Sequence, residues 1–274
     1  MKYTVQSTKY IAKNFWYILP FAIIPAFFFA FSVDKEAIYC ALEIFASGDL
    51  RGFHFAHLFR AVSVLNFASW QAIVFGAIGI VVLVFCVAMM LALLEKHMRI
   101  GKRTYNGLFS KLNDNILSTT GYTLLIVLIY ELWSLILSAL LFFFSRITIM
   151  PIAYTFLIFG FLGMHLLLIY VVGAIYLWLP CMQITGFKSL EALQYSYHLV
   201  SKVKWRILIG QIVLLLLAEF LVCTIAVFMP SEIVFILVST ALYAILIMVY
   251  CVRMEIAYFD RDNIQRADLV KYYR

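Results

Sequence analysis

Six long runs of apolar residues, separated by short polar segments, dominate the chain. Each run reaches about the 20 residues that a helix needs to cross hydrocarbon, and none alternates with the period of two that a barrel strand shows. The predicted transmembrane helices cover residues 15–32, 71–94, 121–145, 154–180, 207–229 and 233–252. The pattern therefore predicts an all-α, polytopic membrane protein whose single domain is the whole of residues 1–274.

The composition supports this interpretation. Hydrophobic residues make up 65% of the chain and charged residues 13%, whereas soluble domains carry about 25% charged residues. Lipid offers no hydrogen bonds to the backbone, so spanning segments must satisfy their own polar groups as helices. The net charge of +7 lies in short segments between the apolar runs, which favours anionic lipid headgroups as partners and argues against nucleic acid.

The positions of the basic residues predict how the helices are oriented. With six spans, 17 lysines and arginines fall in the segments on one side and 4 on the other. Cytoplasmic segments carry the excess of positive charge. We therefore expect a multi-pass protein of the cell membrane with both termini in the cytoplasm.

Two further segments have the pattern of helices that lie on the membrane surface. On the predicted outer side, apolar residues recur at helical spacing over residues 53–65, close to Arg51 and Arg60. On the inner side, residues 187–204 form an amphipathic segment that leads into the fifth span. The basic residues at its end, which we expect to bind anionic lipid, are Lys202, Lys204 and Arg206.

The order of the segments suggests a threefold repeat. Each odd-numbered span follows a short amphipathic stretch and begins near an aromatic residue, which would make the protein three hairpins with surface helices. An alternative stays open, because any helix that enters the membrane from inside can begin with interfacial aromatic and basic anchors.

The stretch from Glu191 to Val200, followed by Lys202–Trp205, carries a resemblance. It is similar to the "A-L-x-x-S-x-x-L" helix found before a lysine and tryptophan in a loose bacterial group of six-helix membrane proteins of unknown function. That group resembles the membrane domain attached to some glycerophosphodiester phosphodiesterases. The motif covers the last third of the chain, and the resemblance implies an architecture without a catalytic residue.

Three ionisable residues lie near the middle of the predicted spans: Glu131, His165 and Glu219. Burying such a group costs several kcal/mol, roughly 2.5–3.5 on insertion scales, so these residues are the leading functional candidates. Polar residues share their helical faces and are expected to line a pathway for a ligand or proton; these are Ser134, Ser138 and Tyr176, with Cys223 one turn beyond Glu219.

Three interpretations of these groups remain open. The glutamates can be protonated and form hydrogen bonds between helices. They can line a cavity or pathway for an ion, proton, small polar solute or lipid headgroup. Alternatively, Glu131, His165 and Glu219, with Cys223, can hold a metal such as zinc or manganese, although three helices would have to converge. No other cofactor is expected.

No sequence motif indicates an enzyme. The chain lacks an HExxH helix, a GxSxG elbow and a Walker lysine loop. The leading hypothesis is a non-enzymatic membrane protein whose carboxylate-containing interior handles a small ligand. The alternatives are an accessory or regulatory subunit of a membrane complex, assembled with a protein partner or a second copy, and a membrane-embedded enzyme that modifies lipid.

Overall fold

The computed structural model describes residues 2–201, 203–229 and 231–269. Within them, six helical segments are long and apolar enough to cross a membrane, which confirms the predicted fold class. The helices that form them are α1 (Lys2–Ser32), α4 (Trp70–Ile100), α5 (Leu108–Ser145), α6 (Met150–Ala174) with α7 (Trp178–Thr185), α9 (Lys204–Phe228) and α10 (Glu232–Arg261).

Several helices extend beyond the apolar runs. The amphipathic stretches before the first and third spans are continuous with α1 and α5, since the backbone stays helical as it leaves the apolar region. A kink at Asn14, where φ is −121° and ψ is 20°, separates the two parts of α1. The Asn14 side chain donates to the carbonyl of Tyr10 (2.9 Å) and accepts from Arg103 Nε (2.8 Å), so the kink is bridged by hydrogen bonds.

The fourth predicted span is broken near its end. α6 stops at Ala174 and α7 starts at Trp178, whereas the sequence predicted a continuous helix over residues 154–180. Pro180 explains the break, because its ring clashes with the carbonyl four residues earlier, that of Tyr176. Residues 175–177 form turns instead.

Between α1 and α4 the chain forms α2 (Lys35–Ser47), the 3₁₀ turn η1 (Leu50–Gly52) and α3 (Phe55–Val62). The predicted helix over 53–65 is therefore shorter than expected, and α2 was not predicted. Its signals are polar and local: Asp34 caps its first turn by accepting from the amide of Ala37 (2.9 Å), and Gly48 ends it at a φ of +81°.

The predicted inner surface helix over 187–204 forms α8 (Ser189–Ser201), and Lys204 already belongs to α9. α8 is tied to the end of α10 by a hydrogen bond from the Tyr195 hydroxyl to Asp262, which also accepts from Tyr258 (2.8 Å). The hydrogen bond to Asp262 raises the pKa of Tyr195 to about 12. A short 3₁₀ turn, η2 (Ala267–Leu269), follows α10.

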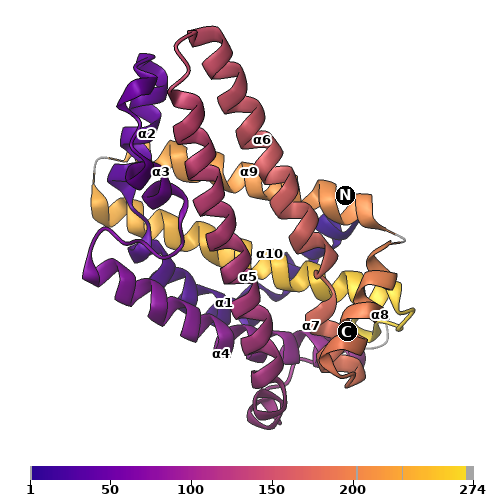
Figure 1. Cartoon of the computed structure of the whole chain (residues 1–274). Helices are drawn as coiled ribbons and strands as arrows, with labels where there is room; N and C mark the ends of the chain where they lie inside the picture. The colour runs from indigo at the N-terminus through magenta and orange to yellow at the C-terminus, as the bar shows by residue number, and fades with distance from the viewer. Residues whose placement is uncertain (1, 202, 230, 270–274) are drawn as a thin grey trace.

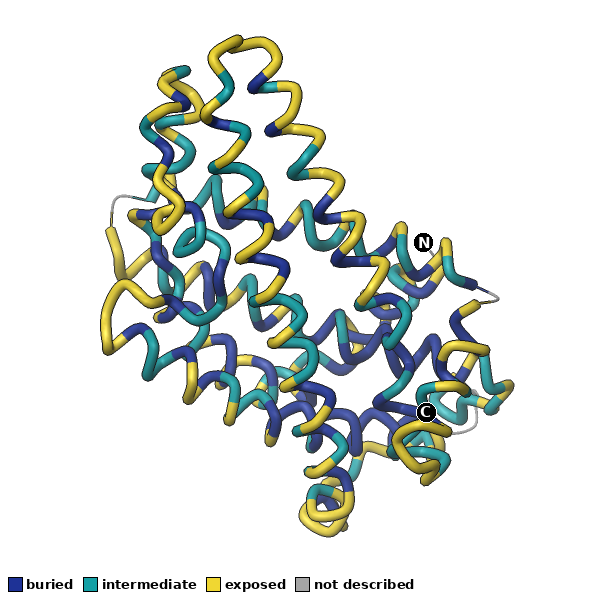
Figure 2. The backbone as a smooth tube through the Cα atoms, in the orientation of Figure 1, coloured by how far each residue is buried: buried dark blue, intermediate teal, exposed yellow. Residues whose placement is uncertain are grey.

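Two groups of helices build the bundle (Figure 1). α1 packs closely along α10 and α4, while the α5–α6 hairpin lies over this group and α9 lies beside α6 and α10. Burial is concentrated where the first half of α1 meets the second halves of α4 and α10 (Figure 2). Residues 251–259 of α10 are buried on every side, as expected of a helix that is surrounded by others.

The two ends of the chain lie at the same end of the bundle. Lys2 forms an ion pair with Asp260 (2.7 Å), and the Tyr3 hydroxyl donates to the same carboxylate (2.7 Å). This arrangement agrees with an even number of crossings. We call this end the inner end and the opposite one, where α1 stops and α4 begins, the outer end; which of them faces the cytoplasm is a prediction from the basic residues.

Cysteine labelling tests the orientation. In a variant whose five cysteines are replaced, we expect Ser231→Cys to react with a membrane-impermeant maleimide in intact cells, because this exposed residue lies at the outer end. Lys102→Cys, exposed at the inner end, should react only after permeabilisation. The opposite labelling pattern would reverse the predicted orientation.

Candidate functional site

Glu131 of α5 binds the segment that returns from α3 to α4. Its Oε1 accepts hydrogen bonds from the backbone amides of Val64 and Leu65, both 3.0 Å away, and its Oε2 lies 2.8 Å from the Ser63 hydroxyl. Two backbone donors thus converge on one oxygen of this carboxyl group. The Glu131 side chain therefore holds residues 63–65 against α5, and among the described residues it forms no ion pair.

Residues 63–65 also contact α1 and α4. The Ser32 hydroxyl, at the end of α1, donates to the carbonyl of Val64 (2.8 Å). Gly76 of α4 allows this approach, since a Cβ there would lie 2.9 Å from the Ser32 hydroxyl and 3.4 Å from the Val64 carbonyl. Three helices and the returning segment thus meet around Glu131, which makes it an anchor for the outer end of the bundle.

His165 of α6 and Glu219 of α9 form a pair. His165 Nε2 lies 2.9 Å from Glu219 Oε1, and Nδ1 lies 2.7 Å from the carbonyl oxygen of Phe161. A carbonyl can only accept, so Nδ1 carries a hydrogen. The contact at Nε2 then needs one more proton, held either by the carboxyl group or by the imidazole. The pair therefore shares one exchangeable proton.

The pair lies beside open space. The His165 side chain is fully buried, and the second oxygen of Glu219, Oε2, is buried without a hydrogen-bond partner among the described residues. An unsatisfied carboxyl oxygen inside a membrane protein is costly. This atom is accordingly available to a ligand or a water molecule.

The serines of the polar stripe predicted on α5 bond within their own helix. Ser134 donates to the carbonyl of Glu131 (2.9 Å) and Ser138 to that of Ser134 (2.7 Å). Both side chains are fully buried, and neither lines the inner or the outer cavity described below. Serine in a helix readily bonds to a carbonyl one turn earlier, and a role of these serines as polar lining stays a prediction.

Tyr176 also has a structural role. It lies in the break between α6 and α7, is fully buried, and donates its hydroxyl hydrogen to the carbonyl of Tyr250 at 3.3 Å. It lines neither of the two cavities described below, and its place on a ligand or proton pathway stays a prediction. A tyrosine in this position fastens the helix break to α10.

The predicted metal ligands do not assemble. Among the described residues, no group of three or more histidine, cysteine, aspartate or glutamate side chains is placed to hold a metal ion. Glu131 is bound by backbone amides, and both nitrogens of His165 already have partners. Cys223 lies near Glu219 in a cavity wall, but the proposed set of four is not brought together.

Two adjoining cavities lie between the two groups of helices. The inner cavity has a volume of about 420 Å³ and the outer one about 560 Å³. Both volumes fall in the range of roughly 300–1,000 Å³ that is usual for ligand pockets. The residues that line both cavities are apolar except for one tyrosine: Leu83, Ile126, Val127, Tyr130, Leu215, Ala218, Leu246 and Ile247.

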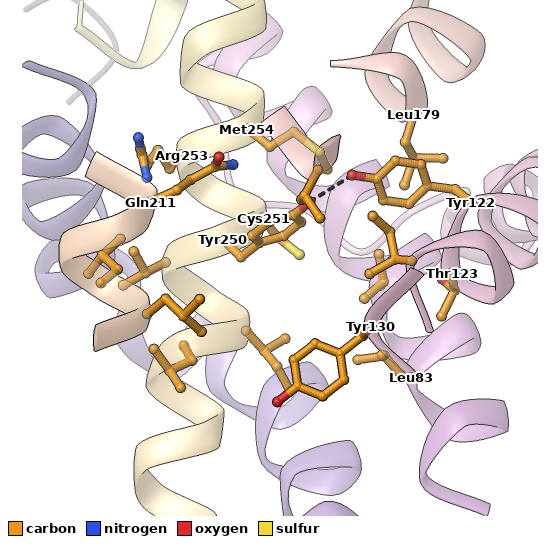
Figure 3. Close-up of a pocket in the computed structure, with 18 of the residues that line it drawn as sticks. Leu83, Tyr122, Thr123, Tyr130, Leu179, Gln211, Tyr250, Cys251, Arg253 and Met254 are labelled. Carbon is orange, nitrogen blue, oxygen red and sulfur yellow. Dashed lines mark hydrogen bonds between the residues drawn. The ribbon is translucent and has the colours of Figure 1, made fainter. Parts of the chain in front are cut away.

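Polar groups are few and lie at separate points of this space. The outer cavity is lined by the His165–Glu219 pair and by the ion pair of Arg60 with Asp34, in which Arg60 Nε lies 2.8 Å from the carboxylate. The inner cavity is lined by Gln211 and Arg253 and by the hydrogen-bonded hydroxyl pair of Tyr122 and Tyr250 (Figure 3), 2.7 Å apart.

Arg253 was missed by the sequence analysis, which counted it among the residues inside the cell. The structure buries it to 1% exposure within α10. A signal was present, because the residues after it continue the apolar pattern with Met254, Ile256 and Ala257. Asp34 and Arg60 were missed as a pair for another reason, since they are 26 residues apart and meet only in the folded chain.

Two of the three basic residues expected to bind anionic lipid, Lys204 and Arg206, are described by the structure. Lys202 lies outside the described residues. The ammonium group of Lys204 lies 4.0 Å from the centre of the Tyr170 ring, and Arg206 is exposed beside Trp205, which is 74% exposed. A basic and aromatic surface of this kind suits a membrane interface.

Comparison with known proteins adds no identity: no family model, curated protein or solved structure matches the chain.

Removing the Glu131 carboxylate should release residues 63–65. We expect Glu131→Ala to lower the free energy of unfolding by roughly 2–4 kcal/mol, because buried donors left without an acceptor cost about 1–3 kcal/mol each. Amide hydrogen exchange of Val64 and Leu65 should become faster. Leu132→Ala is the matched control, since this neighbouring side chain is 52% exposed. Unchanged exchange at both amides would rule out the anchoring role.

Proposed function

We propose that this protein is a non-enzymatic membrane protein that binds a lipid-like molecule in the cavities between its two groups of helices. The observation that carries the proposal is the pair of adjoining cavities, which share eight lining residues. Both spaces are partly open to the surroundings of the bundle. A concave apolar recess of this size is typical of a site that binds a small molecule, which favours an occupant.

The lining indicates what kind of molecule fits. Apolar cavities stay dry and accept apolar ligands, whereas a bound water needs two to four polar partners. Seven of the eight shared residues have apolar side chains, and the eighth is Tyr130. A hydrocarbon chain suits such walls better than a hydrated ion or a polar solute does. The few polar groups can then fix the position of a headgroup.

The proposal keeps the predicted use of a polar interior but changes which residues matter. Glu219 and His165 remain at the ligand, because they line the outer cavity. Glu131, Ser134, Ser138 and Tyr176 hold the scaffold instead. Four further proposals rest on the sequence. They are the location in the cell membrane, the cytoplasmic termini, the resemblance to the six-helix bacterial group, and assembly with a partner or second copy.

Filling the shared wall of the cavities tests the proposal. Pyrene-dodecanol is a neutral probe with one alkyl chain, and its binding can be followed by energy transfer from tryptophan. We expect Ala218→Phe, at a buried position that lines both cavities, to weaken binding at least tenfold. The added ring occupies space that the alkyl chain would use.

Leu217→Phe is the matched control, because Leu217 is the next residue of α9 and is 51% exposed. It should leave probe binding unchanged. Purified protein that neither binds the probe nor carries a co-purified lipid in native mass spectrometry would refute the proposed function.

A second candidate function, proton transfer, is favoured by the His165–Glu219 pair. The pair shares one proton, and Glu219 Oε2 is unpartnered at the outer cavity. In liposomes with an internal pH dye, proton flux should fall severalfold in Glu219→Gln, because an amide cannot exchange the proton. Glu232→Gln, an exposed acid at the start of α10, is the control. Equal flux in wild type and Glu219→Gln would remove this candidate.

A further inference from the structure

Arg253 is a buried cation without an anion. Its side chain is 1% exposed, and it takes part in none of the ion pairs among the described residues. One guanidinium nitrogen, Nη2, donates to the carbonyl of Ile207 (2.7 Å), while Nε has no hydrogen-bond partner within the described part of the chain. Arginine keeps its charge in proteins. A guanidinium in this state is costly unless an anion joins it.

The neighbouring helix leaves room for this guanidinium. A Cβ at Gly210 would lie 2.4 Å from Arg253 Nη2 and 2.9 Å from its central carbon. Any larger residue at this position would force the arginine to move. The Thr4 hydroxyl also lies near this point, 3.1 Å from the same Cβ position. The guanidinium is thus seated between α9, α10 and α1.

Gln211, the residue after Gly210, supplies a second open donor. Both polar atoms of its side-chain amide, Nε2 and Oε1, are buried, and neither has a hydrogen-bond partner in residues 2–201, 203–229 or 231–269. Figure 3 shows Gln211 and Arg253 on the same side of the inner cavity, Gln211 on α9 and Arg253 on α10. Two separate helices therefore bring unsatisfied donors to one part of an otherwise apolar space.

We infer that this part of the inner cavity binds the carboxylate of a single-chain, fatty-acid-like amphiphile. The inference rests on the proposed function and names its ligand class. Arg253 Nε and Gln211 Nε2 donate to the carboxylate oxygens, which neutralises the guanidinium and satisfies both donors. The alkyl chain then extends along Leu214, Leu215 and Ile126, which line the same cavity.

Charge and shape both support a carboxylate. A planar head with two oxygens matches the donors of an arginine, and a neutral head would leave the guanidinium uncompensated. The ligand itself would supply the anion for Arg253, which agrees with the lack of a protein acid in any ion pair with Arg253 among the described residues.

Two probes that differ only in the headgroup provide the test: pyrene-dodecanoate and pyrene-dodecanol, compared at pH 8, where the carboxylate is ionised. Wild-type protein should bind the acid at least tenfold more tightly than the alcohol. Arg253→Met should remove this preference while binding of the alcohol persists. Gln211→Leu should reduce the preference, and Gly210→Ala should reduce it by displacing the guanidinium.

Arg51→Met is the matched control, because Arg51 is an exposed arginine at the outer end, away from the inner cavity; it should keep the full preference. Equal binding of acid and alcohol by the wild type would overturn the inference and leave the proposed function intact. A parallel loss of both probes in Arg253→Met and Gln211→Leu would also overturn it. Tighter binding of a pyrene-labelled alkyl phosphate would overturn the assignment to a carboxylate. Failure of every probe would overturn the inference and, if no lipid co-purifies either, would refute the proposed function as well.

Discussion

A charged group in hydrocarbon needs a partner, and the bundle is arranged around the few that it contains. Glu131 is bound by two backbone amides of a returning segment, His165 and Glu219 bind one another across two helices, and Arg60 binds Asp34. Each of these contacts joins elements that are distant in sequence. They fix the α2–α3 segment to α5, and α6 to α9, at positions where apolar packing alone would allow sliding.

The same requirement separates two kinds of buried group. Glu131 is satisfied within the chain, so it belongs to the scaffold. Arg253, Gln211 and one oxygen of Glu219 keep unsatisfied atoms, and all three residues line a cavity. The apolar space lies between α5, α6, α9 and α10, and these three residues stand in its walls; other buried atoms without a partner among the described residues, such as Glu255 Oε2 and Ser239 Oγ, belong to residues outside both cavities. Because Glu131 is satisfied while Arg253, Gln211 and Glu219 are not, we assign the ligand to the cavities and not to every buried acid.

The spans could be predicted because hydropathy is a local property: every helical segment that can cross the membrane contains one of the expected apolar runs. The partners of the buried polar groups could not be predicted from the sequence. Glu131 meets two backbone amides 66 and 67 residues away and a hydroxyl 68 residues away, which no periodicity reveals. Ser134 and Ser138 shared its helical face, yet bond within their own helix. Arg253 directly follows an apolar run, and its charge suggested an exposed position. Its burial depends on contacts with α1 and α9, which the sequence pattern does not reveal.

The anchor at Glu131 also has a consequence for how the protein is made. Ser63 is synthesised 68 residues before the acid that holds it, so α2 and α3 emerge from the ribosome while α5 does not yet exist. Until then, the amides of Val64 and Leu65 have only water or lipid headgroups to bind. Docking of this segment is consequently a late step of biogenesis, which must await insertion of the third span.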